Sequence, residues 1–249
     1  MSFENKSVLV TGASSGLGAA TVRRFAALGA DVYAASRDQE KLVAVAASCA
    51  DLPGRVNVGF LDVADPASCR EAVAGAVAAS GGLHVLVNNA GRHDFRITTE
   101  VTDEQWDHDI AVNLSGAFHC AKAAIPHLLE SGGAIVNVSS VAGQIGEAYS
   151  AAYTAAKHGV VGLTKSLAVE YVNTQLLVNC VCPGGMDTPQ VHTIDFPPGA
   201  DVELIMRVTA ARGFMSAESV AETIVFLASD AARSMNGAVV AVDHGHLAG

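Results

Sequence analysis

Six short, strongly apolar segments alternate with longer alanine-rich segments over most of this 249-residue chain. The short segments are nearly continuous runs of Val, Ile and Leu, which is typical of strands buried on both faces of a parallel sheet. We expect strands over residues 7–11, 31–35, 55–62, 83–88, 134–139 and 176–182. Helical periodicity between them predicts helices over residues 17–28, 39–50, 66–80, 104–130 and 151–172. This alternation predicts an α/β fold, a single doubly wound parallel sheet with helices on both faces.

No Pro-, Gly- or Ser-rich linker and no internal repeat divides the chain, so we expect one domain over residues 1–249. Asp38 has the pattern of a helix N-cap, and so does Asp65, which Pro66 follows at the first helical position. Three prolines interrupt residues 188–214, which we expect to form a substrate-loop insertion. Open α/β sheets place their ligand site just after a strand in this way. The alternative is a plain surface loop.

The charge balance narrows the choice of partners. The chain has 15 Lys and Arg against 25 Asp and Glu, a net charge of −10 at pH 7. Such a surface repels phosphate backbones and anionic lipid, so neither nucleic acid nor membrane is an expected partner. The five cysteines show no CxxC pair and no ligand spacing with His, which predicts neither disulfides nor a metal site. With no signal peptide and no stretch near the ~18 apolar residues that span a bilayer, we expect a cytoplasmic protein.

Three glycines stand between the first predicted strand and the first predicted helix. Gly12 permits a tight turn, Gly16 lets the backbone approach a ligand, and Gly18 lets helix and strand pack closely. The N-terminus of the helix then offers free N–H groups to a pyrophosphate. The spacing is GxxxGxG and no Gly-Lys-Ser/Thr follows, which excludes a P-loop NTPase. Glycines in a turn can serve packing alone, but their place between strand and helix favours a dinucleotide site.

Six motifs follow one another along the chain. They are Thr11-Gly12-x-x-x-Gly16-x-Gly18, Asn88-Asn89-Ala90-Gly91, Asn113, Ser140, Tyr153-x-x-x-Lys157 and Pro183-Gly184-x-x-x-Thr188. In this order they resemble the short-chain dehydrogenase/reductase family. The resemblance implies a Rossmann fold and an NAD(P)-dependent oxidoreductase that interconverts a secondary alcohol and a ketone by hydride transfer. The alternatives are a non-catalytic nucleotide-binding or scaffold protein on the same fold, and an isomerase or dehydratase with tightly held NAD.

Tyr153 and Lys157 are four residues apart on a predicted helix, so their side chains share a face. A phenol with a pKa of ~10 is a poor base at neutral pH, and a nearby ammonium together with the positive nicotinamide ring of an oxidised cofactor lowers that pKa. The resemblance implies that Tyr153 is the general acid/base and that Ser140 binds the substrate oxygen. It also implies that Asn113 holds a water through which Lys157 relays protons. Ser139 is the alternative to Ser140, and the spacing to Tyr153 favours Ser140.

The end of the second predicted strand bears on the choice between NAD and NADP. By resemblance, Ser36 occupies the usual acidic position and Arg37 the next one, where a guanidinium binds a 2′-phosphate. We therefore expect NADP, with NAD as the alternative because Ser15 is not basic and Asp38 could turn toward the ribose. The resemblance assigns these cofactor-binding residues: Gly12, Ser14, Ser15, Gly16, Leu17, Gly18, Arg37, Asp62, Val63, Asn89, Ala90, Gly91, Tyr153, Lys157, Pro183, Gly184, Met186 and Thr188.

Candidate substrate contacts fall in residues 92–95, 144–149 and 192–214. These segments combine apolar and polar side chains, which suits a mid-sized ketone or secondary alcohol. Only two lysines and no arginine lie between residues 123 and 200, so an acidic acyl carrier protein is not an expected partner. The candidates mix apolar and polar side chains: Phe95, Ile145, Phe196, Met206, Phe214, His93, Gln144 and Glu147.

The resemblance also implies a homotetramer or homodimer. The predicted helices over 104–130 and 151–172 would form a subunit interface, with Gly159 and Gly162 allowing close approach. A last strand over 238–243 would support a tetramer. The alternative is that both glycines pack within the subunit.

Overall fold

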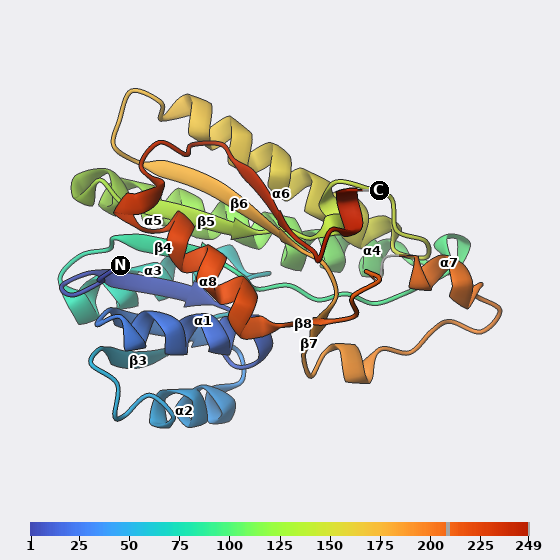
Figure 1. Ribbon diagram of the computed structural model, residues 1–249, viewed down its shortest axis with the longest axis horizontal. Helices are drawn as coiled ribbons and strands as arrows, with labels where there is room; N and C mark the ends of the chain where they lie inside the picture. Colours follow the sequence, from blue (N-terminus) through green and yellow to red (C-terminus); the bar gives the residue numbers. More distant parts are fainter. Residues whose placement is uncertain (208–209, 249) are drawn as a thin grey trace.

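A seven-stranded parallel sheet forms the centre of the molecule, which the computed structural model describes over residues 1–207 and 210–248 (Figure 1). The strand order is β3-β2-β1-β4-β5-β6-β9, as expected for a doubly wound sheet. The order reverses between β1 and β4, and open α/β sheets bind their ligands at such a point. The strands are β1 (Ser7–Thr11), β2 (Asp31–Ser36), β3 (Arg55–Phe60), β4 (Val85–Asn88), β5 (Ala134–Val138), β6 (Leu177–Pro183) and β9 (Val239–Val242).

Helices cover both faces of the sheet and bury two hydrophobic clusters (Figure 1). On one face, α1, α2 and α8 pack through Phe25, Leu42 and Ile224. On the other, α3, α5 and the end of α6 pack around Val73 and Leu128. The longer helices are α1 (Gly16–Ala27), α2 (Gln39–Ala47), α3 (Pro66–Ser80), α4 (Asp103–Ile110), α5 (Gly116–Ser131), α6 (Ala151–Glu170) and α8 (Ala217–Leu227).

Local sequence signals hold at the helix starts but not along the edge strand. Asp38 and Asp65 cap α2 and α3 with their side chains, as predicted. β3, which was expected to be buried on both faces, is instead exposed at Arg55, Asn57 and Phe60. The reason is topological, because β3 is the outermost strand and β2 alone pairs with it.

The helix expected over residues 104–130 is divided in two. α4 begins at a capping box in which Thr102 and Gln105 each bond the other's backbone. A π-helical turn, Ala111–Ser115, follows, and α5 continues from it. Turns of this type are rare and occur mainly at functional sites. Here the turn buries Asn113 beside the carboxyl edge of the sheet.

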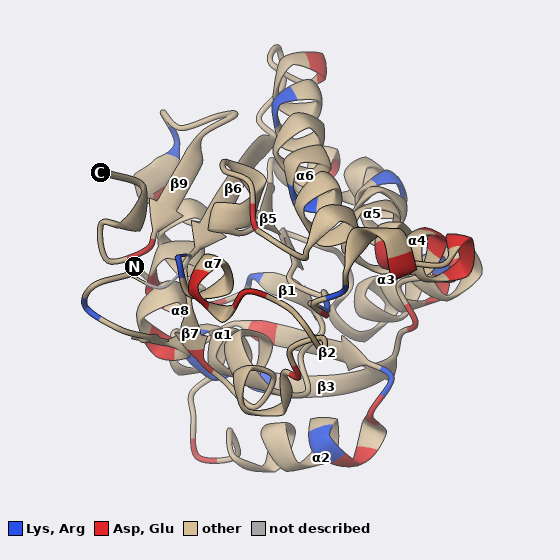
Figure 2. Cartoon of the chain, turned by 90° about the vertical axis from the view of Figure 1, so that its right-hand side faces the viewer, with Lys and Arg blue, Asp and Glu red and all other residues tan. Residues whose placement is uncertain are grey.

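In the segment expected as an insertion, residues 188–207 and 210–214 lie at the carboxyl edge of the sheet, the side that faces the viewer in Figure 2. The short strands β7 (Met186–Asp187) and β8 (Met215–Ser216) pair at its two ends, and α7 (Val202–Met206) lies between them. Residues 208–209 of the expected insertion, and Gly249, lie outside the described residues. Within the described chain, no helix has the length and apolar character needed to cross a membrane.

The two glycines of α6 differ in surroundings. A Cβ on Gly159 would come within 2.7 Å of the Leu114 side chain, so this glycine serves packing inside the chain, which was the alternative interpretation. A Cβ on Gly162 would meet no described atom within 4 Å. Only Gly162 therefore leaves α6 open to close approach from outside.

Candidate active site

The glycine loop between β1 and α1 has the conformation that its sequence predicts. Gly12 and Gly16 have φ values of +64° and +50°, which strain any residue with a side chain. A Cβ on Gly18 would overlap the Gly12 carbonyl oxygen, so only glycine lets α1 pack this closely on the turn. The N-cap Ser15 makes no side-chain cap, and the first turn of α1 holds no acidic residue. This helix N-terminus therefore fits a pyrophosphate.

The turn after β4 holds the glycine loop in place. Asn89 donates from Nδ2 to the carbonyl oxygens of Thr11 (3.0 Å) and Gly12 (3.2 Å). In return, Thr11 Oγ1 accepts from the backbone N–H groups of Asn89 and Ala90, each at 3.0 Å. Asn88 instead points into the core and donates to Asn137 Oδ1 at 2.9 Å. Asn89 thus belongs to the site, and Asn88 supports the sheet beneath it.

A cleft runs along the carboxyl edge of the sheet from Arg37 at one end to Tyr153 at the other. Its walls include every residue that the resemblance assigned to cofactor binding. The glycine loop lies between the two ends and lines both parts of the cleft. The structure therefore brings together positions that are spread from residue 12 to residue 188 of the chain.

The far end of this cleft meets a second, mainly apolar pocket. Ser140 and Tyr153 line both spaces. Lys157, one helical turn after Tyr153, is buried, and its Nζ lies 5.5 Å from the centre of the Tyr153 ring. The same Nζ donates to the Val138 carbonyl oxygen at 3.0 Å. A proton-transfer group, a cationic neighbour and a hydroxyl donor thus meet at one junction.

The structure separates the two candidate serines. Ser139 Oγ is buried and donates to the Lys157 carbonyl oxygen at 2.8 Å, so it fixes β5 to α6. Ser140 Oγ accepts from the Ala142 N–H at 3.2 Å, and Ser140 lines the junction beside Tyr153, whose pKa it lowers. The geometry favours Ser140 as the residue that meets a substrate oxygen.

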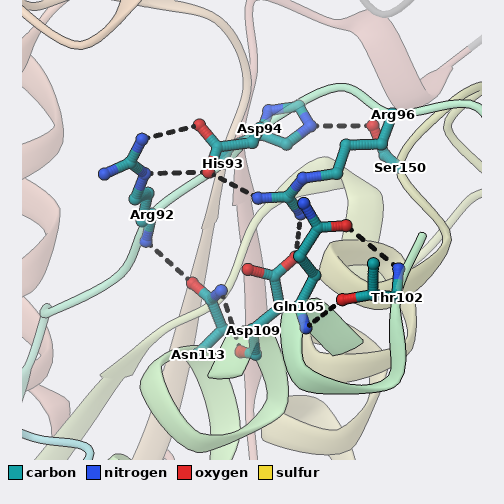
Figure 3. Close-up of polar contacts among 9 residues, drawn as sticks. All are labelled: Arg92, His93, Asp94, Arg96, Thr102, Gln105, Asp109, Asn113 and Ser150. Atoms are coloured by element: carbon teal, nitrogen blue, oxygen red, sulfur yellow. Dashed lines mark hydrogen bonds and ion pairs between the residues drawn. The ribbon is translucent and has the colours of Figure 1, made fainter. Parts of the chain in front are cut away.

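Both polar atoms of the Asn113 side chain form hydrogen bonds within the protein. Its Oδ1 accepts from the Arg92 N–H at 2.9 Å, and its Nδ2 donates to the Asp109 carbonyl oxygen at 3.0 Å (Figure 3). Gly91 passes directly beside it, since a Cβ there would lie 3.0 Å from Asn113 Oδ1 and 3.3 Å from Lys157 Nζ. The side chain of Asn113 therefore positions the loop that follows β4, next to Lys157.

The electrostatics of the protein alone favour the neutral form of the Tyr153 phenol. Burial raises the pKa of Tyr153 well above its usual range, and the Glu147 carboxylate raises it further. The hydrogen bond from Ser140 only partly opposes this shift. Burial also lowers the pKa of Lys157 to about 8. For the protein alone, desolvation of the phenolate dominates. The expected lowering of the tyrosine pKa also involves the positive nicotinamide ring of an oxidised cofactor, and it stays a prediction.

The second pocket contains most of the expected substrate contacts. Phe95, Phe196, Met206 and Phe214 form its apolar walls, while Ile145 and Gln144 do not line it. Gly185 makes room for one wall, because a Cβ there would lie 2.7 Å from the Phe214 ring. Val141 was not among the expected pocket residues, and its position next to Ser140 is the signal that points to it. Gln190 and Val191 also line the pocket and fall in the expected insertion over residues 188–214.

The adenosine end of the cleft holds Arg37 and Asp38. Arg37 is exposed and forms no ion pair with any residue in the described chain. Asp38 is occupied, because it accepts from the Lys41 N–H at 3.0 Å and pairs with Lys41 Nζ at 2.7 Å. Among the described residues no cluster of His, Cys, Asp and Glu could hold a metal ion.

Comparisons with known proteins agree with this geometry. A family model described as short chain dehydrogenase matches residues 6–196. The chain is 38% identical over 246 residues to the 3-oxoacyl-[acyl-carrier-protein] reductase FabG of Thermotoga maritima, covering 98% of this chain and 99% of that protein. It is 37% identical over 246 residues to meso-2,3-butanediol dehydrogenase of Serratia marcescens, with 98% and 96% covered. A solved short chain dehydrogenase from Burkholderia cenocepacia J2315, in complex with NADP, has a TM-score of 0.89 at 32% identity, with 99% and 100% covered.

The fold and the site thus define a dinucleotide-dependent oxidoreductase. The chain belongs to the short-chain dehydrogenase/reductase family, as its motifs predicted. Members of this family are NAD(P)-dependent enzymes that interconvert alcohols and ketones, and this chain has the same catalytic role. The alternative of a non-catalytic scaffold is not supported.

Proposed function

We propose that this protein interconverts a secondary alcohol and a ketone with NADP(H), and that Tyr153 is its general acid/base. One observation carries the proposal: Tyr153 lines both the dinucleotide cleft and the substrate pocket, so its hydroxyl meets both reactants. When bound, the nicotinamide ring supplies or accepts the hydride, and its oxidised form carries a positive charge that favours the phenolate.

Residues of the protein bind the substrate oxygen and transfer the proton. Ser140 binds the substrate oxygen and stabilises the charge that develops there. In the reductive direction Tyr153 gives its proton to that oxygen, and in the oxidative direction it takes the proton back. Lys157, held at the Val138 carbonyl, favours the ionised phenol and restores its proton. Asn113 positions the adjoining loop beside Lys157, and a water held there would complete the relay that the family resemblance implies.

The choice of NADP rests on the adenosine end of the cleft. Arg37 lines that end with its guanidinium exposed, where it can bind a 2′-phosphate with two hydrogen bonds. Asp38 caps α2 and pairs with Lys41, which holds its carboxylate away from a ribose hydroxyl. Relatives solved with NADP or NADPH support the same choice.

We further propose a single domain in which residues 188–214 cover a small-molecule substrate. The substrate pocket brings no lysine or arginine to its walls, which supports a neutral ketone or alcohol rather than a carrier-bound acyl group. Five free, buried cysteines support a reducing, cytoplasmic location. The exposed Phe118, Leu129 and Val169 of α5 and α6 support an interface in a homodimer or homotetramer.

A screen of ketones and alcohols with both nicotinamides tests the activity. We expect turnover of at least one carbonyl with NADPH and a slower reaction with NADH. Tyr171→Phe is the matched control for Tyr153→Phe, because Tyr171 lies at the end of α6, away from both pockets. Binding of both cofactors without hydride transfer to any substrate would contradict the proposal.

A further inference from the structure

Glu147 brings a carboxyl group into the substrate pocket without a hydrogen-bond partner among the described residues. Its side chain is only 7% exposed and lines the pocket. Neither oxygen takes part in a hydrogen bond with any described residue, and the nearest cationic candidate, His93 Nε2, lies 3.7 Å away. A buried polar group of this kind is costly unless a ligand satisfies it.

His93 connects this carboxyl to the reacting centre. Its ring stacks on the Tyr153 ring, with centroids 4.2 Å apart and planes inclined by 19°. Its Nε2 hydrogen-bonds Ser150 Oγ at 2.7 Å. Burial lowers the pKa of His93 to about 4, so the ring is neutral and gives Glu147 no positive charge at neutral pH. The carboxyl therefore lies one imidazole ring away from the catalytic phenol.

The loop that carries His93 is braced on both sides (Figure 3). Asp94 pairs with Arg92 at 2.8 Å and with Arg96 at 2.9 Å. Arg96 reaches on to Asp109 of α4 at 2.6 Å. The loop around His93 is thus held in place by the protein itself before any substrate enters.

The other walls of the pocket define what Glu147 can bind. They are mostly aromatic and aliphatic, and no lysine or arginine lines the pocket within the described chain. An anionic substrate group would find no cation here and would face the Glu147 carboxylate. A hydroxyl group, by contrast, would donate to it while the rest of the molecule contacts Phe95 and Phe214.

We propose that Glu147 is a specificity-determining residue that accepts a hydrogen bond from a second hydroxyl of the substrate, close to the reacting carbon. The substrate class is then a diol, or the corresponding hydroxyketone, on a small apolar frame, and not a keto acid. This inference rests on the proposed function, since it places the reacting oxygen at Ser140 and Tyr153.

Three compounds with the same six-membered ring test it: cyclohexanol, cis-1,2-cyclohexanediol and cis-2-hydroxycyclohexanecarboxylate. Each is oxidised with NADP⁺ at about pH 8.5, because burial raises the pKa of Glu147 to about 7 and the carboxyl is mostly ionised above that value. Because hydrogen bonds to charged groups are strong, we expect the kcat/KM of the diol to exceed that of cyclohexanol roughly tenfold or more. The carboxylate should be the poorest of the three. Glu147→Leu should bring the diol-to-cyclohexanol ratio close to one. Glu147→Gln, whose amide oxygen still accepts, should keep part of the ratio and improve the carboxylate.

The control is Glu100→Leu, which removes an exposed carboxyl outside the pocket and should leave all three ratios unchanged. Binding of the same compounds to the NADP⁺-loaded Tyr153→Phe protein, measured by NMR titration, gives a readout that needs no turnover. Equal affinity for diol and cyclohexanol, or a diol preference that survives Glu147→Leu, would overturn the inference. If the diol binds more tightly than cyclohexanol but the unaltered enzyme turns over neither compound, the proposed function is refuted and the inference about Glu147 stands.

Discussion

Arg37 offers the sharpest test of the cofactor assignment. The guanidinium is exposed at the adenosine end of the cleft and has no ion-pair partner in the described chain, so its expected role is to bind the 2′-phosphate. A hydrogen bond to a charged group is worth about 1.5–3 kcal/mol, and solvent screening at this exposed position favours the lower half of that range. At about 1.4 kcal/mol per factor of ten, Arg37→Ala should raise the Kd for NADPH roughly tenfold to thirtyfold.

The same variant should leave NADH binding nearly unchanged, because NADH lacks the phosphate. Fluorescence titration with both cofactors measures the two constants directly. Arg37→Lys keeps the charge but not the forked geometry, so its NADPH affinity should be intermediate. The matched control is Arg70→Ala, an exposed arginine of α3 outside the cleft. Equal weakening of NADH and NADPH, or no change in either, would refute this account of NADP preference.

Three further variants test the site in other ways. Gly18→Ala should lower cofactor affinity at least tenfold and destabilise the fold by about 1–3 kcal/mol, because its Cβ overlaps the Gly12 carbonyl. Urea titration measures the loss of stability, and Gly162→Ala, whose Cβ meets no described atom, is the control. Lys157 has a folded pKa of about 8 against 10.5, so wild-type stability rises with pH between these values. Lys157→Met should therefore be inactive. Its free energy of unfolding at pH 7 should exceed that of the unaltered protein by about 1–2 kcal/mol, once the lost hydrogen bond is subtracted, and this difference should shrink towards pH 10.5. A constant difference across that window would contradict the burial argument. Glu147→Gln removes a negative charge that raises the Tyr153 pKa, so the pH profile of alcohol oxidation should move to lower pH; an unmoved profile would show that the two groups do not interact.

Much of the fold follows from short-range patterns. The boundaries of α3 at Pro66–Ser80 match the prediction at both ends, because Asp65 caps the start and Gly81 takes the left-handed conformation at the end. The glycine loop was equally predictable, since positive φ at Gly12 and the tight contact at Gly18 admit no other residue. These features depend on interactions within a few residues.

Other features depend on contacts that the sequence does not display. The π-helical turn at Ala111–Ser115 leaves the apolar periodicity almost unchanged, so one long helix was expected there. The helix α8 was not predicted, because its N-cap, Ser216, directly follows an irregular segment and was not recognised as a helix start. The strands β7 and β8 have only two residues each and are defined by their pairing alone.

In the site, too, the features set by local motifs were predictable and those set by long-range contacts were not. Every residue expected at the cofactor lines the cleft, because the family motifs lie at the strand ends that meet there. Burial of the phenol and the nearby Glu147, which raise the pKa of Tyr153 in the protein alone, arise only after folding and cannot be read from the sequence. His93 and Glu147, 54 positions apart, were recognised as pocket candidates, but their contact with each other and with Tyr153 required the three-dimensional arrangement.

The most direct test of the account is the rate of hydride transfer in Tyr153→Phe, measured in a single turnover with saturating NADPH and a ketone that the unaltered enzyme reduces. General acid catalysis by a positioned group contributes about 10²–10⁴-fold, so the rate should fall by that factor while the Kd for NADPH stays within about twofold. A rate within a few-fold of the unaltered enzyme would contradict the assignment of Tyr153 as the proton donor.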